Sequence, residues 1–335
     1  MTSLPRRDPI TARIGLLAVS TVLSCAAGYW AYDRYRTANL SGIELNVAAW
    51  EASYRERGET VPPGGPREGY WGERLGQKVP DRYLHHHERE IHVPGLIDID
   101  GDGLQHASNS PEPRHRILLI GGSVAFGAYA SSIDNTYFVQ MLKILGDRGY
   151  ALELTVDAAG AWTSFNETAA YRTRGLRAQP EVVMFLDGLN DLSQARPEVT
   201  RRPVESYIAN MRLALALSRR SGVRMVAILQ PLLAAKRFKT SLEQRILEFP
   251  AKADRGPDTP ADWPQRYVDA FATFRRALTQ MSRTLGGMSF VDCSDALSEQ
   301  RETTFADFWH FGDAGHRLLA RCVAEGLAPV LDSLP

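Results

Sequence analysis

The chain has 335 residues, which is long enough for one large domain or two modest ones. Its 39 Lys and Arg residues balance 39 Asp and Glu residues, so the formal net charge is zero and no basic surface indicates a nucleic-acid partner. With three cysteines and no phosphate-binding Gly-rich loop, His-Glu-x-x-His or Cys-x-x-Cys motif, the sequence excludes a disulfide framework and indicates no metal or organic cofactor.

The first predicted element is an N-terminal membrane segment at residues 14–32. This uncharged run of about 19 residues is long enough to span a bilayer and has charged residues on both sides. We expect a signal-anchor, with residues 1–13 as a cytoplasmic tail. A signal peptide cleaved near residues 26–28 and a lipoprotein anchored at Cys25 are the alternatives, and a buried soluble helix is a further one. Every alternative except the last places the rest of the chain outside the cytoplasm.

Residues 33–110 are predicted to form an extracytoplasmic linker or extension. Residues 43–54 have the apolar spacing of a helix, and the prolines and glycines of residues 61–66 break regular structure. The adjacent histidines at 85–87 suggest a metal site, but neighbours in sequence point in different directions, so a solvated surface stretch is favoured. Residues 98–103 match half of a calcium loop without its bidentate Glu, so a turn-rich loop is favoured there.

From residue 111 to residue 335 the pattern alternates between strands and helices. The predicted strands are 116–121, 152–157, 181–187, 223–229 and 288–292, and the predicted helices lie near 135–148, 164–176, 203–220, 264–286 and 314–331. This alternation predicts an α/β domain, a three-layer sandwich with a five-stranded, mostly parallel sheet between helices.

Two features of this domain have two interpretations each. Residues 231–263 interrupt the alternation and are expected either to shape substrate access or to form a solvated surface excursion. Cys293 and Cys322 could pair in an oxidising compartment, but two separate buried thiols are the favoured interpretation.

The sequence around Ser123 indicates a nucleophile. Ser123 follows a predicted buried strand, and Gly121 and Gly122 allow the backbone to turn at the end of that strand. A serine hydroxyl needs a base to take its proton, and His310 is the best candidate. Asp307 lies three residues before His310, so its carboxylate can hold one imidazole nitrogen and leave the other for Ser123.

An attacked carbonyl becomes an oxyanion, which requires donors already in place. We expect three of them: the backbone N–H of Ser123, the backbone N–H of Gly160 and the side-chain amide of Asn190. Each follows a predicted parallel strand, and the carboxyl ends of such strands meet at one edge of the sheet.

His316 is an alternative base, because Asp313 precedes it by three residues. We favour His310 because Phe308 and Trp309 flank it, and we interpret Asp313 as the N-cap of the last helix.

In this order, the motifs resemble the SGNH hydrolases, also called the GDSL family of esterases and lipases. The family is named for Ser, Gly, Asn and His in four separate blocks, which Ser123, Gly160, Asn190 and His310 match over about residues 114–330. One difference is that Gly122 stands where the family usually has Asp. The α/β-hydrolase elbow Gly-x-Ser-x-Gly fits less well, because position 125 is Ala. The resemblance implies a flavodoxin-like sandwich and no cofactor.

The resemblance and the N-terminal segment together lead us to expect a serine esterase that acts outside the cytoplasm through an acyl-enzyme. An O-acetyl group on a polysaccharide is the preferred substrate, and Trp162 and Trp309 are expected either to stack on sugar rings or to line the core. An O-acyltransferase that acts on an envelope polysaccharide or exopolysaccharide is the first alternative. A non-catalytic module of an envelope assembly is the second.

Overall fold

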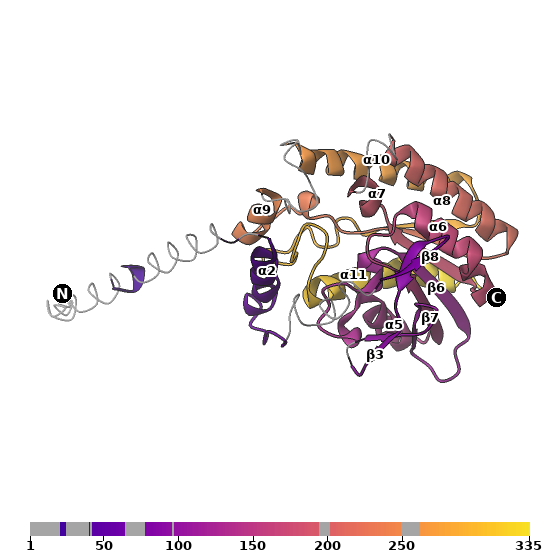
Figure 1. Cartoon of the computed structure of the whole chain (residues 1–335), viewed down its shortest axis with the longest axis horizontal. Coiled ribbons are helices and arrows are strands. Elements are labelled where there is room, and N and C mark those ends of the chain that lie inside the picture. The colour runs from indigo at the N-terminus through magenta and orange to yellow at the C-terminus, as the bar shows by residue number, and fades with distance from the viewer. Residues whose placement is uncertain are drawn as a thin grey trace, which may run out of the picture.

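The computed structural model describes residues 21–24, 40, 42–63, 78–95, 97–193, 202–248 and 262–335. In this part of the chain, a central sheet lies between two groups of helices, as the layers in Figure 1 show. The predicted α/β sandwich is therefore confirmed.

The central sheet has six strands in the order β10-β9-β8-β6-β7-β5. The parallel strands are β6 (His115–Gly121), β7 (Leu152–Ala158), β8 (Val182–Asp187), β9 (Arg224–Leu229) and β10 (Met288–Asp292). All residues of β8 are buried, as expected for a strand that is covered on both faces.

The prediction of five strands is wrong by one strand. β5 (Gln105–Ser108) pairs antiparallel with β7 at the edge of the sheet, although it lies in the segment predicted to be a linker. Its sequence, Gln-His-Ala-Ser, carries no alternation of apolar and polar residues, so only its partner strand identifies it.

In the described part of the chain, five helices cover the two faces of the sheet. They are α5 (Tyr137–Asp147), α6 (Ser164–Thr173), α8 (Pro203–Arg220), α10 (Trp263–Thr284) and α11 (Asp313–Leu331). α5 packs against α11 on one side, while α6 packs against α8 and α8 against α10 on the other. The predicted bounds of α8 are confirmed at both ends. The helix begins at Pro203, which favours a first helical turn, and it ends before a Gly-containing turn.

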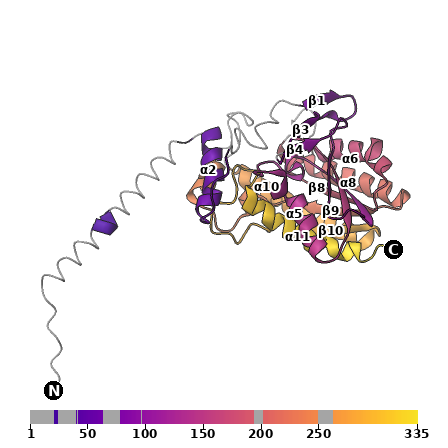
Figure 2. The same cartoon turned by 90° about the horizontal axis from the view of Figure 1, so that it is seen from below.

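Further elements surround this framework. They are α2 (Ile43–Arg55), β1 (Lys78–Asp81), β2 (His85–Glu88), β3 (Ile91–Val93), β4 (Ile97–Ile99), α4 (Ser123–Phe126), η2 (Ile133–Asn135), η3 (Gly175–Ala178), α7 (Leu189–Ser193), η4 (Leu233–Ala235) and α9 (Ser241–Glu248). β1 pairs with β2 and β3 with β4 as separate antiparallel hairpins. α2 stands at one end of the domain against α9, and the β1–β2 hairpin lies at its rim (Figure 2).

The predicted membrane segment, residues 14–32, lies outside the described residues except for a helical turn at residues 21–24. Within the described ranges, no helix combines the length and the apolar character that a membrane span requires.

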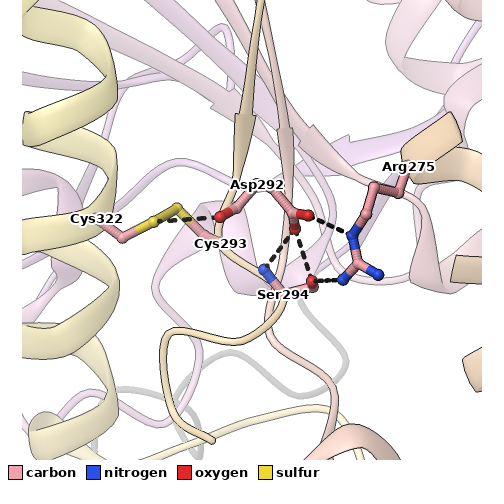
Figure 3. Close-up of a disulfide and its surroundings, with 5 residues drawn as sticks. All are labelled: Arg275, Asp292, Cys293, Ser294 and Cys322. Atoms are coloured by element: carbon pink, nitrogen blue, oxygen red, sulfur yellow. Dashed lines mark hydrogen bonds and ion pairs between the residues drawn. A yellow bond between two sulfur atoms is a disulfide. The ribbon is translucent and has the colours of Figure 1, made fainter. Parts of the chain in front are cut away.

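A disulfide joins Cys293, just after β10, to Cys322 in α11 (Figure 3). The favoured prediction of two separate thiols is therefore wrong. The two Cα atoms lie 5.9 Å apart although the cysteines are 29 positions apart in the chain. This separation lies within the range that a disulfide bridges, and it depends on how α11 packs beside β10 rather than on any local sequence pattern.

Candidate active site

Ser123 lies at the carboxyl end of β6, where the strand turns directly into the short helix α4. It is the first residue of that helix, and N–H groups in a first turn have no acceptor within their own helix. Gly121 has no room for a side chain, because an added Cβ would lie 2.4 Å from the carbonyl oxygen of Leu186 in β8. The tight packing between β6 and β8 thus fixes the position of the serine.

The structure brings Ser123, His310 and Asp307 together. The Nε2 atom of His310 lies 2.7 Å from the Oγ atom of Ser123, and its Nδ1 atom lies 2.7 Å from Oδ2 of Asp307. Because an ionised carboxylate only accepts hydrogen bonds, Nδ1 donates to Asp307 and Nε2 is left to accept the serine proton. The arrangement can therefore remove a proton from the serine hydroxyl.

Asp307 is held by more than the imidazole. Its Oδ1 atom accepts the backbone N–H groups of Trp309 at 2.6 Å and His310 at 2.7 Å. Burial acts to raise the pKa of Asp307, but the charge of His310 and these hydrogen bonds outweigh it and lower the pKa below the ordinary value for aspartate. The carboxylate therefore stays ionised and can orient the imidazole.

Tyr129, which no sequence pattern identified, covers the other side of the imidazole. Its ring stacks on the His310 ring with centroids 4.9 Å apart and planes 5° apart. The carbonyl oxygen of Tyr129 accepts the indole N–H of Trp50 in α2 at 3.0 Å. The N-terminal extension thus reaches His310 through a single intervening residue.

The segment before Asp307 is held by two further elements outside the α/β alternation. From α2 and the turn that follows it, Arg57 donates to the carbonyl oxygen of Thr303 at 2.7 Å. From α9, the Glu243 carboxylate accepts the N–H groups of Thr304 and Phe305 at 3.0 and 3.1 Å. These contacts restrain the chain immediately upstream of the Asp307–His310 turn.

Glu243 also forms a fully buried ion pair with Lys236, whose Nζ atom lies 2.6 Å from both carboxylate oxygens. Both side chains lie in the predicted insertion at residues 231–263, part of which is outside the described residues. Since removal of one partner would leave a buried charge unpaired, this pair makes the insertion a rigid support in its described part.

Asn190 lies in α7, directly after β8, on the opposite side of Ser123 from His310. Its Nδ2 atom donates to the carbonyl oxygen of Trp162 at 2.7 Å. The amide also packs on Gly122, where an added Cβ would lie 2.4 Å from Nδ2 and 3.3 Å from the Trp162 oxygen. Gly in place of the usual Asp therefore makes room for the Asn190 amide beside Ser123.

The residue after Asn190 fixes α7 to α6. Asp191 accepts the backbone N–H of Ser164 at 3.0 Å and its hydroxyl at 2.5 Å. Burial, followed by the charge of nearby Asp187, raises the pKa of Asp191 to about 8.

The structure gives Gly160 a different role from the predicted one. Its N–H donates to the Oε1 atom of Glu88 in β2 at 3.0 Å, and the contact is buried. This N–H is occupied by a carboxylate, so the prediction that it serves as an oxyanion donor is wrong for this conformation. Its carbonyl oxygen accepts from Lys78 at 2.8 Å and from His86 at 2.9 Å.

The alternative base, His316, does not face the nucleophile. Its Nε2 atom donates to the carbonyl oxygen of Ala128 at 3.1 Å, and its Nδ1 atom accepts the N–H of Tyr137 at 3.3 Å. Burial lowers its pKa to about 3, so it remains neutral. Asp313 accepts from Ser131 instead of orienting His316, and Gly312 occupies the N-cap position that was predicted for Asp313.

The remaining predicted ligand groups form local contacts. His86 binds Gly160, and the Nδ1 atom of His87 lies 2.8 Å from the carbonyl oxygen of Glu88. In the loop at residues 98–103, Asp100 accepts the N–H groups of Asp102 and Leu104, which makes a turn. The described ranges contain no group of three or more side chains placed to hold a metal ion.

The two tryptophans near the site differ in exposure. Trp162 is fully buried, and its indole N–H donates to the carbonyl oxygen of His86 at 2.9 Å, so it lines the core rather than a sugar site. Trp309 is partly buried and packs edge-on against Phe308.

A known protein family matches most of the α/β domain. The model of the GDSL-like Lipase/Acylhydrolase family matches residues 119–318, which include Ser123, Asn190, Asp307 and His310. No curated protein sequence matches the chain.

Similar solved structures include three esterase-like proteins. The acetylxylan esterase Axe2 from Geobacillus stearothermophilus is 15% identical, with 64% of this chain and 94% of that chain covered and a TM-score of 0.46. The acetyl xylan esterase AlAXEase is 12% identical, with 63% and 98% covered and a TM-score of 0.45. A provisionally assigned acylhydrolase from Bacteroides fragilis NCTC 9343 is 14% identical, with 66% and 91% covered and a TM-score of 0.44.

Proposed function

We propose that this chain, which belongs to the GDSL-like lipase/acylhydrolase family and is a hydrolase of ester bonds, uses Ser123 as its nucleophile. The observation that carries the proposal is the hydrogen-bonded series from Ser123 through His310 to Asp307, with both distances at 2.7 Å. A nucleophile, a base within reach of it and a group that orients the base are the parts that acyl transfer needs.

In the first step, the Oγ atom of Ser123 attacks the ester carbonyl carbon while His310 accepts the hydroxyl proton. The carbonyl oxygen becomes an oxyanion, for which the Ser123 N–H and the Asn190 amide are the proposed donors. His310 then gives its proton to the departing alcohol, and an acyl group remains on Ser123.

In the second step, His310 takes a proton from water, and the resulting hydroxide attacks the acyl-enzyme. The acid leaves, and Ser123 regains its proton from His310.

The proposed substrate is an O-acetyl group on a polysaccharide, and the proposed location is outside the cytoplasm, by anchoring or export through residues 14–32. The Cys293–Cys322 disulfide supports this location, because disulfides persist in oxidising compartments. If alkylation of the protein in freshly lysed cells were to label both cysteines, this support would be lost.

The test of the catalytic proposal is hydrolysis of p-nitrophenyl acetate by the full chain. Ser123→Ala should lower kcat by about 10⁶-fold while the circular dichroism spectrum is retained. Folded Ser123→Ala protein with near-normal turnover would remove Ser123 from the mechanism. If the folded wild-type protein is active only when a sugar acceptor is added, acyl transfer to that acceptor would replace hydrolysis as the proposed reaction.

A further inference from the structure

The β1–β2 hairpin contacts the α/β domain beside the candidate active site. β1 and β2 pair only with each other in the described structure, with Lys78 opposite Glu88 at the open end of the hairpin. An isolated two-stranded hairpin is only marginally stable in water, so its position depends on what it contacts.

Both backbone polar groups of Gly160 are held by this hairpin. The N–H donates to Glu88 at 3.0 Å, and the carbonyl oxygen accepts from Lys78 at 2.8 Å and from His86 at 2.9 Å. Gly160 and the Glu88 side chain are buried, so these groups would lose their partners without regaining water if the hairpin contacts were removed.

Two further hydrogen bonds extend the contact along the same loop. The indole N–H of Trp162 donates to the carbonyl oxygen of His86 at 2.9 Å. The side-chain amide of Asn166 donates to the carbonyl oxygen of Leu84 at 3.1 Å. Leu84 packs in a small buried cluster with Ala159 and Trp162. The hairpin thus restrains the loop from the end of β7 to the first turn of α6.

This loop is the partner of Asn190. The Trp162 carbonyl oxygen accepts from Nδ2 of Asn190 at 2.7 Å, and Gly122 lies against the same amide. A change in the direction of the Trp162 carbonyl would therefore rotate the amide beside Ser123.

On these contacts, and resting on the proposed function, we propose that the β1–β2 hairpin positions the Asn190 amide for the oxyanion by holding Gly160 and Trp162. Glu88, Lys78 and His86 are positioning residues, because they reach the reaction only through the loop and Asn190. Displacement of a reacting group by about 1 Å can cost about 100-fold in rate, so the effect should be measurable.

The experiment is a double-mutant cycle on the full chain, with kcat and KM for p-nitrophenyl acetate. Glu88→Ala should lower kcat by about 10- to 100-fold with little change in KM. Glu88→Gln should keep at least half of the activity, because its amide oxygen can still accept the Gly160 N–H. Glu90→Ala is the matched control, since Glu90 is exposed and its carboxylate pairs with His92 rather than with Gly160 or Trp162.

In the Asn190→Ala background, Glu88→Ala should cost less than about 2-fold, because the group it positions is gone. The proposal would be overturned if Glu88→Ala lowered kcat by the same factor in both backgrounds. It would also be overturned if Glu88→Gln and Glu88→Ala lowered kcat equally. If Glu88→Ala does not fold, His86→Gln replaces it in the same cycle with the same expected coupling.

A second readout does not depend on turnover. The side-chain amide signals of Asn190, identified as those lost in Asn190→Ala, should shift in the ¹H–¹⁵N spectrum of Glu88→Ala and not in that of Glu90→Ala. Unchanged signals would overturn the positioning role even if Ser123 proves to be the nucleophile. Shifted signals would support it even if the proposed reaction fails.

Discussion

The two sides of Ser123, the proposed nucleophile, are built in different ways. On the base side, Asp307 and His310 belong to one turn, and the bonds between them are made within four consecutive residues. On the oxyanion side, Gly122, Trp162 and Asn190 come from the ends of three different strands and meet only in the folded chain.

This difference separates what local sequence can encode from what packing must supply. The base-side turn brings its own hydrogen bonds, and α2 and α9 restrain the chain that leads into it. The oxyanion side has no such local turn. The direction of the Asn190 amide depends instead on Gly122, on the Trp162 carbonyl oxygen and on the β1–β2 hairpin. We expect substitutions on the two sides to differ in size and in kind.

The largest effect should come from breaking the base side. His310→Ala should lower kcat by about 10⁶-fold, because it removes the proposed base that lies 2.7 Å from the Ser123 hydroxyl. His316→Gln is the control, since His316 lies in the same part of the chain but contacts Ala128 and Tyr137. The assignment of the base would be reversed if His316→Gln were inactive and His310→Ala active in esterase assays on folded protein.

Breaking the oxyanion side should cost less. Asn190→Ala should lower kcat by about 10²- to 10³-fold, because one of the proposed oxyanion donors is lost while the nucleophile and base remain. The measurement is steady-state turnover of p-nitrophenyl acetate, with KM expected to change little. Full activity in this variant would exclude the amide from stabilising the oxyanion.

Gly122→Ala sharpens the comparison, because it removes none of the proposed catalytic groups. The extended backbone at Gly122, with φ of −83°, tolerates Ala, but the added methyl would meet Nδ2 of Asn190 at 2.4 Å. We expect the amide to move and kcat to fall by about 10- to 100-fold. The thermal midpoint should stay within a few degrees of that of Gly286→Ala, whose methyl meets nothing within 4 Å. A large drop in midpoint with normal kcat would contradict this explanation.

The smallest effect concerns stability rather than rate. It comes from His316, a buried imidazole near the base side. The pKa of His316 is about 3 in the folded protein against an ordinary 6.5. The unfolded chain therefore binds a proton that the folded protein does not, and stability should fall as the pH drops below 6.5. Between pH 6.5 and 4.5 this group should remove about 2 kcal/mol from the free energy of unfolding.

Urea unfolding at pH 6.5, 5.5 and 4.5 gives the free energy of unfolding of the wild type and of His316→Gln at each pH. The contribution of His316 is the difference between the two proteins in how steeply this free energy falls with pH. The variant should lose less stability than the wild type over this range. Equal losses in both proteins would mean that His316 is protonated in the folded state.

The same contrast explains how far the sequence predicts the structure. Apolar runs and helical spacing depend on near neighbours, so α8 and β10 were predicted with their observed bounds, and Asp307 was paired with His310. The partner of the Gly160 N–H lies 72 positions away, and no pattern in the sequence points from Glu88 to it. The Cys293–Cys322 pairing was only the less favoured of two interpretations for the same reason.

The edge strand β5 has a consequence beyond the site. β7 would otherwise expose a row of unpaired backbone groups, to which a strand of a second molecule could add. β5 occupies that position with four residues, His106 and Ser108 among them, and its short, polar sequence offers little for another strand to pair with. The segment before the α/β alternation thus protects this edge of the sheet against edge-to-edge aggregation.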